Sequence, residues 1–365
     1  MRVVIAGGGT GGHLFPGIAI AEEFLRRDQK TAVVFIGTQR GIESRLLAKL
    51  GYTLEEIDIE GIKGRGVKAL MKGVCQIPKS MAQSRRIMKN FQPDLVVGVG
   101  GYASGPAVLV AHWMGVPTVI AEQNAICGVT NKILGRFVDK IFVTYDQTRE
   151  FFPRDKVVVS GNPVRSAVVL PPQPRLEKKG YWQLLVFGGS QGAEAINGCL
   201  AEMTPLLETI KDKIRILHQT GARQKDEIAR RYAEHGINAE VKDFILDMAK
   251  AYQESDLIVC RAGATSLAEI TAAGRAAVLI PYPFAADDHQ LKNAQALAAQ
   301  GAAVVIQESE LNAERLFDTV MSLLKDEGKR TQMEACSKKM GRPEAAATIV
   351  NHCEALIEQR KKAAA

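Results

Sequence analysis

The chain has 365 residues and a formal net charge of +7, and 46% of its residues are hydrophobic and 24% charged. This composition excludes a disordered or fibrous protein, and the length predicts two domains. Six scattered cysteines without a Cys-x-x-Cys pair or a Cys/His cluster exclude a disulfide framework and a zinc site. The apolar stretch Val3–Ala6 is too short for a signal peptide and runs directly into glycines.

The first element is a β-branched strand, Arg2–Ala6, followed by five glycines within the six residues from Gly7 to Gly12. A helix is expected next, over Leu14–Arg27. Glycine tolerates positive φ, so the N–H groups of such a loop can converge on an anion at the helix N-terminus. His13 then stands beside a site of phosphate size.

Three interpretations of this loop compete. The pattern Gly7-x-Gly9-x-x-Gly12 matches a dinucleotide fingerprint, but the next strand, Ala32–Ile36, ends in Gly37-Thr38 without the acidic residue that binds a ribose. A phosphate-binding Walker loop is excluded, because its nearest match, Gly73 to Lys79-Ser80, has Pro78 where the motif requires its second glycine. The third interpretation is a glycine turn without a ligand. A second glycine-rich loop, Gly188–Gly192, again lies between a strand and a helix. Because the same arrangement occurs twice, a glycine turn without a ligand is disfavoured.

The first half alternates strands and helices, as a doubly wound parallel sheet requires. Its uncharged stretch Leu95–Ala121 has the length of a membrane span, but Gly100-Gly101, Pro106 and Pro117 interrupt it. We therefore expect strand, loop, short helix and strand there. The expected strands of this half are Arg2–Ala6, Ala32–Ile36, Leu95–Gly98, Thr118–Ala121, Lys140–Val143 and Val157–Val159.

The second half repeats this alternation after Gly161–Arg165 and the proline-rich connection Pro171–Pro174. Two Rossmann-like domains with glycine loops at strand ends imply a ligand cleft between them. The segment Glu344–Gln359 is expected to be a helix and Arg360–Ala365 a solvated tail. The expected strands are Leu184–Phe187, Ile214–His218, Glu240–Phe244, Leu257–Cys260, Ala277–Ile280 and Ala303–Ile306.

The segment Arg261–Glu269 follows one of these strands and opens a helix with small residues. Its N–H groups and dipole favour the negative charge of a diphosphate. Glu269 lies one turn after Thr265 and can accept two hydrogen bonds from the diol of a ribose. The alternative is an exposed helix glutamate without a ligand.

With these loops and a set of further motifs, the chain resembles the MurG family of bacterial glycosyltransferases almost from end to end. Members of that family move N-acetylglucosamine from UDP-N-acetylglucosamine to lipid I, the undecaprenyl-diphosphate muramyl-pentapeptide, to give lipid II. The motifs that carry the resemblance are Gly8–His13, Gly100–Pro106, Glu122–Asn124, Gly161–Arg165, Gly188–Ala193, Arg261–Glu269 and Pro281–Ala294.

The resemblance implies an α/β fold of GT-B architecture, with two Rossmann-like, doubly wound parallel-sheet domains facing a central cleft. Residues 1–163 would bind the acceptor and dock on the membrane, and residues 164–343 would bind the UDP-sugar. Residues 344–365 would pack back toward the first domain. The implied donor contacts are Thr10, Gly11 and Gly12 near sugar and diphosphate, Asn124 on the sugar, Arg165 and Ser190 on the diphosphate, the backbone of Ile245 on uracil, Ala264, Thr265, Ser266, Leu267, Ala268 and Glu269 on phosphate and ribose, and Gln290 on sugar hydroxyls. His289 before Gln290 leaves that last contact open.

The reaction needs a base for the acceptor hydroxyl and positive charge beneath the leaving diphosphate. The sequence contains no Asp-x-Asp pair for a divalent metal, so we expect Arg165 and helix N-termini to act without a metal or cofactor. In-line attack then inverts the anomeric centre. His13 is the expected base because imidazole titrates near neutrality; Glu122 is the alternative base, and His13 could instead cap its loop or only bind the acceptor.

The excess of basic residues lies in the first half, where residues 1–165 contain 22 Lys and Arg against 14 Asp and Glu. The window Gly61–Phe91 alone holds eight basic residues and no acidic one. It is either a solvated helix with its apolar side in the core or an amphipathic helix docked on anionic lipid. A polyprenyl-diphosphate acceptor favours docking, and so a peripheral protein on the cytoplasmic face of the bacterial plasma membrane.

The partners that the resemblance implies are UDP-N-acetylglucosamine, lipid I, the anionic membrane surface and candidate cell-wall synthesis proteins. Two other functions stay open. A nucleotide-sugar epimerase of the same fold would release UDP without any acceptor. A nucleic-acid-binding protein would use the basic window, but that window lacks the interleaved aromatic residues on which bases stack.

Overall fold

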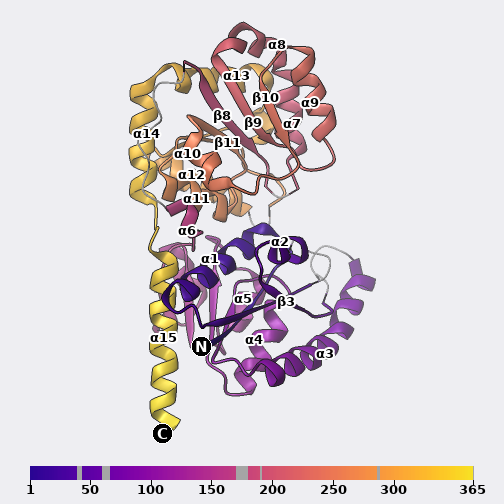
Figure 1. Ribbon diagram of the computed structural model, residues 1–365, viewed down its shortest axis with the longest axis vertical. Coiled ribbons are helices and arrows are strands. Elements are labelled where there is room, and N and C mark those ends of the chain that lie inside the picture. Colours follow the sequence, from indigo (N-terminus) through magenta and orange to yellow (C-terminus); the bar gives the residue numbers. More distant parts are fainter. Residues whose placement is uncertain (39–42, 60–65, 170–179, 190, 286–287, 365) are drawn as a thin grey trace. The chain divides into compact units, whose positions relative to one another are not determined.

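The computed structural model describes residues 1–38, 43–59, 66–169, 180–189, 191–285 and 288–364 of the chain. It consists of two compact units (Figure 1). Unit 1 is formed by Met1–Arg165 together with Pro343–Ala365, and unit 2 by Ser166–Arg342.

The described part of unit 1 contains one parallel sheet of seven strands in the order β3-β2-β1-β4-β5-β6-β7. The order reverses between β1 and β4, which are hydrogen-bonded neighbours in the centre of the sheet. Ligands of such sheets bind beyond the carboxyl ends of the strands at this switch point. The strands are β1 (Arg2–Ala6), β2 (Ala32–Gly37), β3 (Thr53–Glu56), β4 (Leu95–Gly98), β5 (Thr118–Glu122), β6 (Lys140–Val143) and β7 (Val157–Val159).

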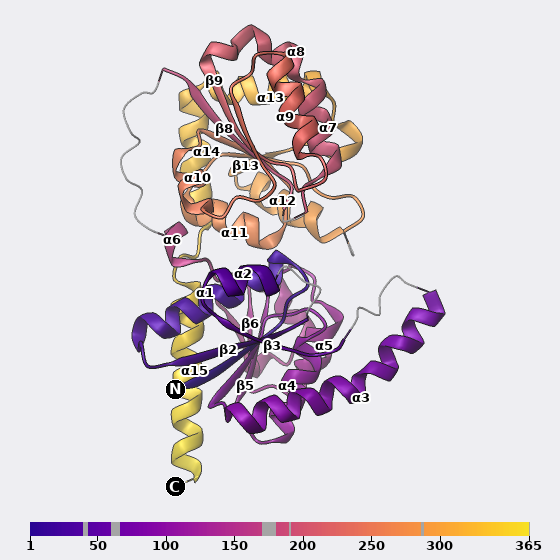
Figure 2. The ribbon, with the colours of Figure 1, turned by 45° about the vertical axis from the view of Figure 1, so that its right-hand side comes forward.

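Helices cover both faces of this sheet, because successive side chains of a strand point to opposite sides. Val3 and Ile5 of β1 pack with α1 and α15, whereas Val4 and Ala6 pack with α3 and α4. Figure 2 shows α15 beside α1 within unit 1. The helices are α1 (Gly11–Arg27), α2 (Glu43–Lys49), α3 (Gly66–Phe91), α4 (Ser104–Trp113), α5 (Val129–Leu134) and α15 (Ala345–Ala364).

Helix α15 is part of the core of unit 1. Its residues Ile349, Val350 and Cys353 are fully buried in the cluster that also contains α1. Arg27 of α1 pairs with Glu354 at 2.7 Å. Residues 360–363 are exposed, as expected of a solvated tail, but the expected end of the helix at Gln359 is wrong, because the helix continues to Ala364. Ala and Lys are good helix formers, and Arg360 forms an ion pair with Asp139 at 2.7 Å.

The described part of unit 2 contains a parallel sheet of six strands in the order β10-β9-β8-β11-β12-β13. One face packs against α7, α9 and α13 in a single hydrophobic cluster. The strands are β8 (Trp182–Phe187), β9 (Ile214–Gln219), β10 (Ala239–Lys242), β11 (Leu257–Cys260), β12 (Ala277–Leu279) and β13 (Ala303–Val305). The helices include α6 (Ser166–Val169), α7 (Glu194–Glu202), α8 (Thr204–Leu207), α9 (Lys225–Glu234), α10 (Met248–Glu254), α11 (Ala264–Ala273), α12 (His289–Ala299), α13 (Ala313–Lys325) and α14 (Glu327–Met340).

The uncharged stretch Leu95–Ala121 forms β4, α4 and β5, as expected. Among the described residues, none of the helices combines the length and the apolar character needed to cross a membrane. The basic window forms the amphipathic helix α3 from Gly66 onward. Strand β3 was not expected, and α1 begins at Gly11 rather than at Leu14.

Candidate active site

Two glycine loops of unit 1 lie against each other at the switch point. The first follows β1 and the second follows β4. A Cβ at Gly101 would lie 2.5 Å from the carbonyl oxygen of Gly8, and a Cβ at Gly7 would lie 2.6 Å from that of Gly100. All four of these glycines have positive φ angles. The backbones can therefore meet only because neither loop carries side chains here.

His13 lies in the first turn of α1, directly behind the first loop. Its Nδ1 is 3.1 Å from Oε1 of Gln123, the residue that follows β5. A Cβ at Gly100 would lie 2.7 Å from Nδ1 and 2.9 Å from Cε1 of His13. One edge of the imidazole is thus held between the Gly100 backbone and the Gln123 amide, and the second glycine loop serves as the support of the histidine.

Glu122 ends β5 and is buried. Its Oε1 accepts hydrogen bonds from the backbone N–H and the side-chain Nδ2 of Asn124, at 3.0 and 3.2 Å. Its Oε2 accepts from the N–H of Gly128 and from Nδ2 of Asn131, at 3.0 and 2.9 Å. With two donors on each oxygen, this carboxylate organises the loop from Asn124 to Gly128, and it orients the Asn124 side chain.

Thr10, Gly11 and Gly12 form the start of α1. Thr10 occupies the N-cap position with extended backbone angles, and its side chain makes no capping hydrogen bond. The helix dipole gives this end positive character. The guanidinium of Arg165, the last residue of the first segment of unit 1, lies 4.4 Å from the ring centroid of Phe15 on the same helix. A cation is therefore held beside the first turns of α1.

Unit 2 repeats the glycine contact at its own first strand. A Cβ at Gly192, after β8, would overlap the carbonyl of Thr220, which follows β9. The buried Gln219 joins the neighbouring loops: its Nε2 donates to the Gly189 carbonyl, and its Oε1 accepts from the Ile245 N–H, both at 2.7 Å. The backbone of Ile245 is thereby fixed, with its N–H engaged. Ser190 lies outside the described residues.

The segment Ala264–Glu269 forms the first turns of α11, with Gly263 as the N-cap residue in extended conformation. Glu269 is only 5% exposed, and its Oε2 accepts a hydrogen bond of 3.0 Å from the hydroxyl of Tyr252. The alternative of an exposed helix glutamate is therefore wrong. Ala264, Thr265 and Leu267 are also buried, whereas Ser266 and Ala268 are partly exposed.

Gln290 lies in the first turn of α12, where its Oε1 accepts a hydrogen bond of 3.0 Å from the N–H of Tyr282. Arg261, which opens the motif before α11, forms an ion pair of 2.5 Å with Glu308. It also donates to the carbonyl oxygens of Ile280 and Pro281. This arginine therefore ties the ends of neighbouring strands together.

In the part of the chain that the structure describes, no three His, Cys, Asp or Glu side chains lie close enough together to hold a metal ion. The five cysteines whose side chains the structure describes are free thiols, and burial raises the pKa of the Cys260 thiol above its usual range. Gln123, Gln219 and Tyr252 were not predicted from the sequence, although they contact the expected site residues His13, Ile245 and Glu269. For Gln123 the signal was its place between the two chosen residues Glu122 and Asn124.

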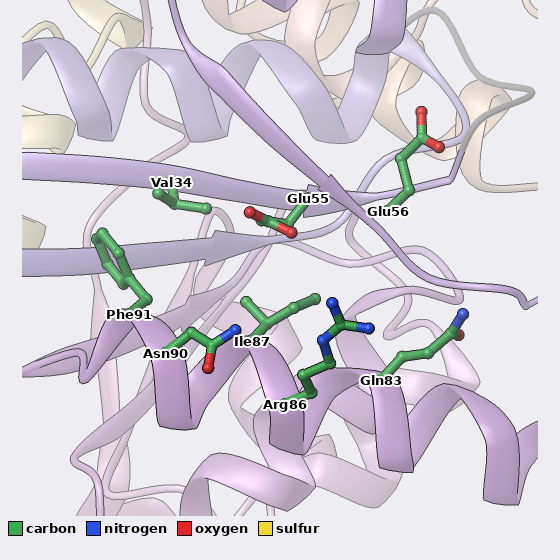
Figure 3. Close-up of a pocket in the computed structure, with 8 residues that line it drawn as sticks. All are labelled: Val34, Glu55, Glu56, Gln83, Arg86, Ile87, Asn90 and Phe91. Carbon is green, nitrogen blue, oxygen red and sulfur yellow. The ribbon is translucent and has the colours of Figure 1, made fainter.

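A pocket of about 460 Å³ in unit 1 is separate from these residues. It lies between α3 and the strands β2 and β3. Figure 3 shows Arg86, Ile87, Asn90 and Phe91 of α3 on one side of it, and Val34 and Glu55 on the other. Its lining residues include none of the expected site residues.

Comparison with known proteins identifies the class. Residues 3–143 match the glycosyltransferase family 28 N-terminal domain, and residues 183–349 match the glycosyltransferase family 28 C-terminal domain. Two parallel-sheet domains of this kind define a glycosyltransferase with the GT-B fold.

Relatives narrow the class to a family. The UDP-N-acetylglucosamine–N-acetylmuramyl-(pentapeptide) pyrophosphoryl-undecaprenol N-acetylglucosamine transferase of Syntrophus aciditrophicus is 51% identical over 98% of this chain and 99% of its own. That of Geobacter metallireducens is 48% identical over 99% of this chain and 100% of its own. The crystal structure of Acinetobacter baumannii MurG matches with a TM-score of 0.73 and 34% identity, over 98% of this chain and 99% of the other. The chain belongs to the MurG family of N-acetylglucosamine transferases.

The fold is shared more widely. UDP-GlcNAc 2-epimerase from Neisseria meningitidis, solved with UDP-GlcNAc bound, has a TM-score of 0.67 over 97% of this chain and 99% of its own, at 13% identity. At that identity the likeness concerns the fold alone.

Proposed function

We propose that this enzyme transfers N-acetylglucosamine from UDP-N-acetylglucosamine to the muramyl 4-hydroxyl of lipid I, with inversion and without a metal ion, and that His13 is the general base. The observation that carries the choice of base is the contact between His13 Nδ1 and Gln123 Oε1. A side-chain amide oxygen can only accept a hydrogen bond, so a neutral His13 keeps its lone pair on Nε2.

Glu122 is the weaker candidate for the base. Each of its carboxylate oxygens accepts two hydrogen bonds, from Asn124 and Gly128 of the loop that follows β5 and from Asn131 of α5. Taking a proton from an acceptor hydroxyl would disrupt some of them and release that loop. We assign Glu122 to the orientation of Asn124, whose amide contacts the donor sugar in this proposal.

The leaving UDP is stabilised by positive charge from several sources. Arg165 supplies a cation beside α1, and the N-termini of α1 and α11 supply N–H groups and dipoles. Thr10, Gly11 and Gly12 act at the first helix and Ala264–Ala268 at the second, with Ser190 as a further diphosphate contact. The absence of an Asp-x-Asp pair from the sequence supports a reaction without a divalent cation.

Recognition of the nucleoside falls to unit 2, which also contributes to binding of the sugar. Glu269 binds the ribose diol, and the hydroxyl of Tyr252 holds its carboxylate in place. Gln219 already occupies the Ile245 N–H, so the Ile245 carbonyl is the backbone group that accepts from uracil N3–H. Gln290 contacts the sugar hydroxyls with its amide.

Mass analysis of the product tests the reaction. Incubation with UDP-N-acetylglucosamine and a lipid I analogue should give the disaccharide product and UDP in equal amounts, and chelation of divalent cations should leave the rate unchanged. Release of UDP that does not depend on the acceptor would instead support an epimerase of the same fold. Loss of the reaction on chelation would overturn the metal-free mechanism.

We also propose that unit 1 docks peripherally on the anionic cytoplasmic face of the plasma membrane. Trp113 of α4 and Ile133 of α5 are 65% and 53% exposed, and α4 packs against α5. Lys132 and Arg136 are exposed on either side of Ile133. Apolar side chains mixed with basic ones suit the interface of an anionic bilayer. The side chains of Lys68 and Lys72 in α3 lie outside the described residues, and Lys79 pairs with Asp58 at 2.7 Å.

Sedimentation with vesicles tests this docking. Replacing Trp113 and Ile133 by Ser should reduce binding to vesicles that contain an anionic lipid, while turnover of a short soluble acceptor stays unchanged. Leu50→Ser is the matched control, because Leu50 is similarly exposed in unit 1 but follows α2. Equal binding by the double variant and the parent would overturn the proposed surface.

A further inference from the structure

We propose that Gln123 is a positioning residue that holds the proton of the neutral His13 imidazole on Nδ1, and so keeps Nε2 ready to accept the proton of the acceptor hydroxyl. The inference rests on the proposed role of His13 as the base. In this role Gln123 acts through His13 and does not itself touch the substrates.

The orientation of the Gln123 amide is determined by its surroundings. The side chain is buried, and its Nε2 donates two hydrogen bonds of 3.1 Å, to the carbonyl oxygens of Val99 and Ala121. Both N–H groups of the amide are thereby used on acceptors that cannot donate. The Oε1 atom must therefore face His13, and Nδ1 of the histidine must be the donor across the 3.1 Å contact.

The imidazole is held at this contact by the second glycine loop. Gly100 has a φ of +93°, and a Cβ there would lie 2.7 Å from Nδ1 of the ring. The same loop follows Val99, whose carbonyl anchors the Gln123 amide. One short segment after β4 therefore fixes both members of the pair.

This arrangement matters because a neutral histidine in water prefers to carry its proton on Nε2, and such a tautomer cannot act as a base at that atom. In the proposed step the acceptor oxygen forms its bond to the anomeric carbon while the bond to the UDP oxygen breaks. The hydroxyl proton moves to Nε2, the electron pair leaves with UDP, and the imidazolium keeps its Nδ1–H on Gln123.

Nuclear magnetic resonance of the ¹⁵N-histidine-labelled full chain tests the tautomer without any turnover. At a pH where His13 is neutral, its Nε2 should show the chemical shift of an unprotonated nitrogen and its Nδ1 that of a protonated one. The His13→Ala variant identifies the signals. A proton on Nε2 in the parent protein would overturn the inference, whatever the activity of the variants.

Gln123→Met removes the acceptor while keeping the length of the side chain. We expect the His13 signals to shift toward the Nε2–H tautomer and kcat to fall about ten- to a hundredfold, the range for one lost hydrogen bond in a transition state, with the donor KM unchanged. Added to His13→Ala, it should cause no further loss of kcat, because its effect passes through that histidine. An additive loss, or unchanged kcat and tautomer in the single variant, would contradict this role.

Gln219→Met is the matched control, because Gln219 is also a buried glutamine that joins two loops at the end of a strand. It should raise the donor KM and leave the His13 tautomer unchanged. A tautomer shift in this control as well would mean that loss of packing, and not loss of the acceptor, explains the Gln123 variant. If His13→Ala retains its kcat while the parent shows Nδ1–H, the proposed base is wrong although the tautomer assignment holds.

Discussion

In both units, glycines allow the backbones of two loops to come into close contact. The two units differ in which loops meet and in the side chains that surround the contact. In unit 1 the loop after β1 meets the loop after β4, across the switch point, at Gly101 and Gly8. In unit 2 the loop after β8 meets the loop after β9, away from the switch point, at Gly192 and Thr220.

In each unit a buried glutamine at the end of a strand joins the neighbouring loops. Gln123 accepts from a histidine ring, whereas Gln219 accepts from the backbone N–H of Ile245. In unit 1 the buried glutamine therefore positions a side chain that can take up a proton. In unit 2 it positions a segment of backbone. This difference fits the proposed division between acceptor chemistry in unit 1 and donor recognition in unit 2.

The largest expected effect breaks the chemistry of unit 1. His13→Ala should lower kcat by about 10² to 10⁴, the range for a lost general base, and should remove the acidic limb of the pH–rate profile. Steady-state kinetics across pH measure both. If the variant keeps that limb and raises only the acceptor KM, His13 binds the acceptor and the base lies elsewhere.

The glycine contact of unit 2 is tested by two substitutions at positive φ. Gly192→Ala should destabilise the protein by about 3 kcal/mol or more, because its Cβ overlaps the Thr220 carbonyl in addition to the backbone strain. Gly189→Ala carries the same kind of strain but meets nothing within 4 Å, so about 1 kcal/mol is expected. Denaturant unfolding compares the two; equal losses would show that strain alone accounts for both.

Donor recognition in unit 2 gives a smaller effect. Glu269→Ala should raise the donor KM about ten- to a hundredfold with little change in kcat, because the ribose is bound equally in the ground and transition states. Tyr252→Phe, which removes the hydrogen bond of 3.0 Å to that carboxylate, should have a weaker effect in the same direction. A fall in kcat at constant KM would place Glu269 in the chemical step.

A second histidine sharpens the contrast with His13. His218 of unit 2 is fully buried, and its Nδ1 is 3.0 Å from the Tyr232 hydroxyl. The Asn197 amide donates to Thr220 and to Gln224, so its oxygen accepts from His218 Nε2, 3.1 Å away. This histidine therefore holds its proton on Nε2, the opposite of His13, and both of its nitrogens are used inside the protein.

Burial lowers the pKa of His218 to about 3. Below the ordinary pKa of about 6.5 the unfolded chain binds a proton that the folded chain does not, so the stability present above that pH is lost progressively toward pH 3. Between pH 7 and pH 5 the loss from this group is roughly 2 kcal/mol. Relative to the parent, His218→Gln should show a flatter dependence of the free energy of unfolding on pH; parallel curves would refute this assignment.

The strands were predictable to within a few residues because β-branched runs bounded by glycines are a local signal. Strand β3 was missed because it is a short edge strand, Thr53–Glu56, with two exposed glutamates. The burial of Glu269 and the role of Gln123 depend on partners far along the chain, Tyr252 and His13. The place of Gln123 between Glu122 and Asn124 could single out the residue, but the spacing of neighbouring residues does not signal either partner.

The return of the chain to unit 1 through α15 has a consequence for synthesis on the ribosome. Unit 2 is continuous in sequence, whereas the core of unit 1 needs both β1 and the buried residues Ile349 to Ile357. Domains generally fold as their residues emerge. The second unit can therefore be complete first, while the sheet face of the first unit stays uncovered until α15 has been synthesised. A stop codon before Ala345 would leave that face exposed permanently and create an aggregation-prone chain.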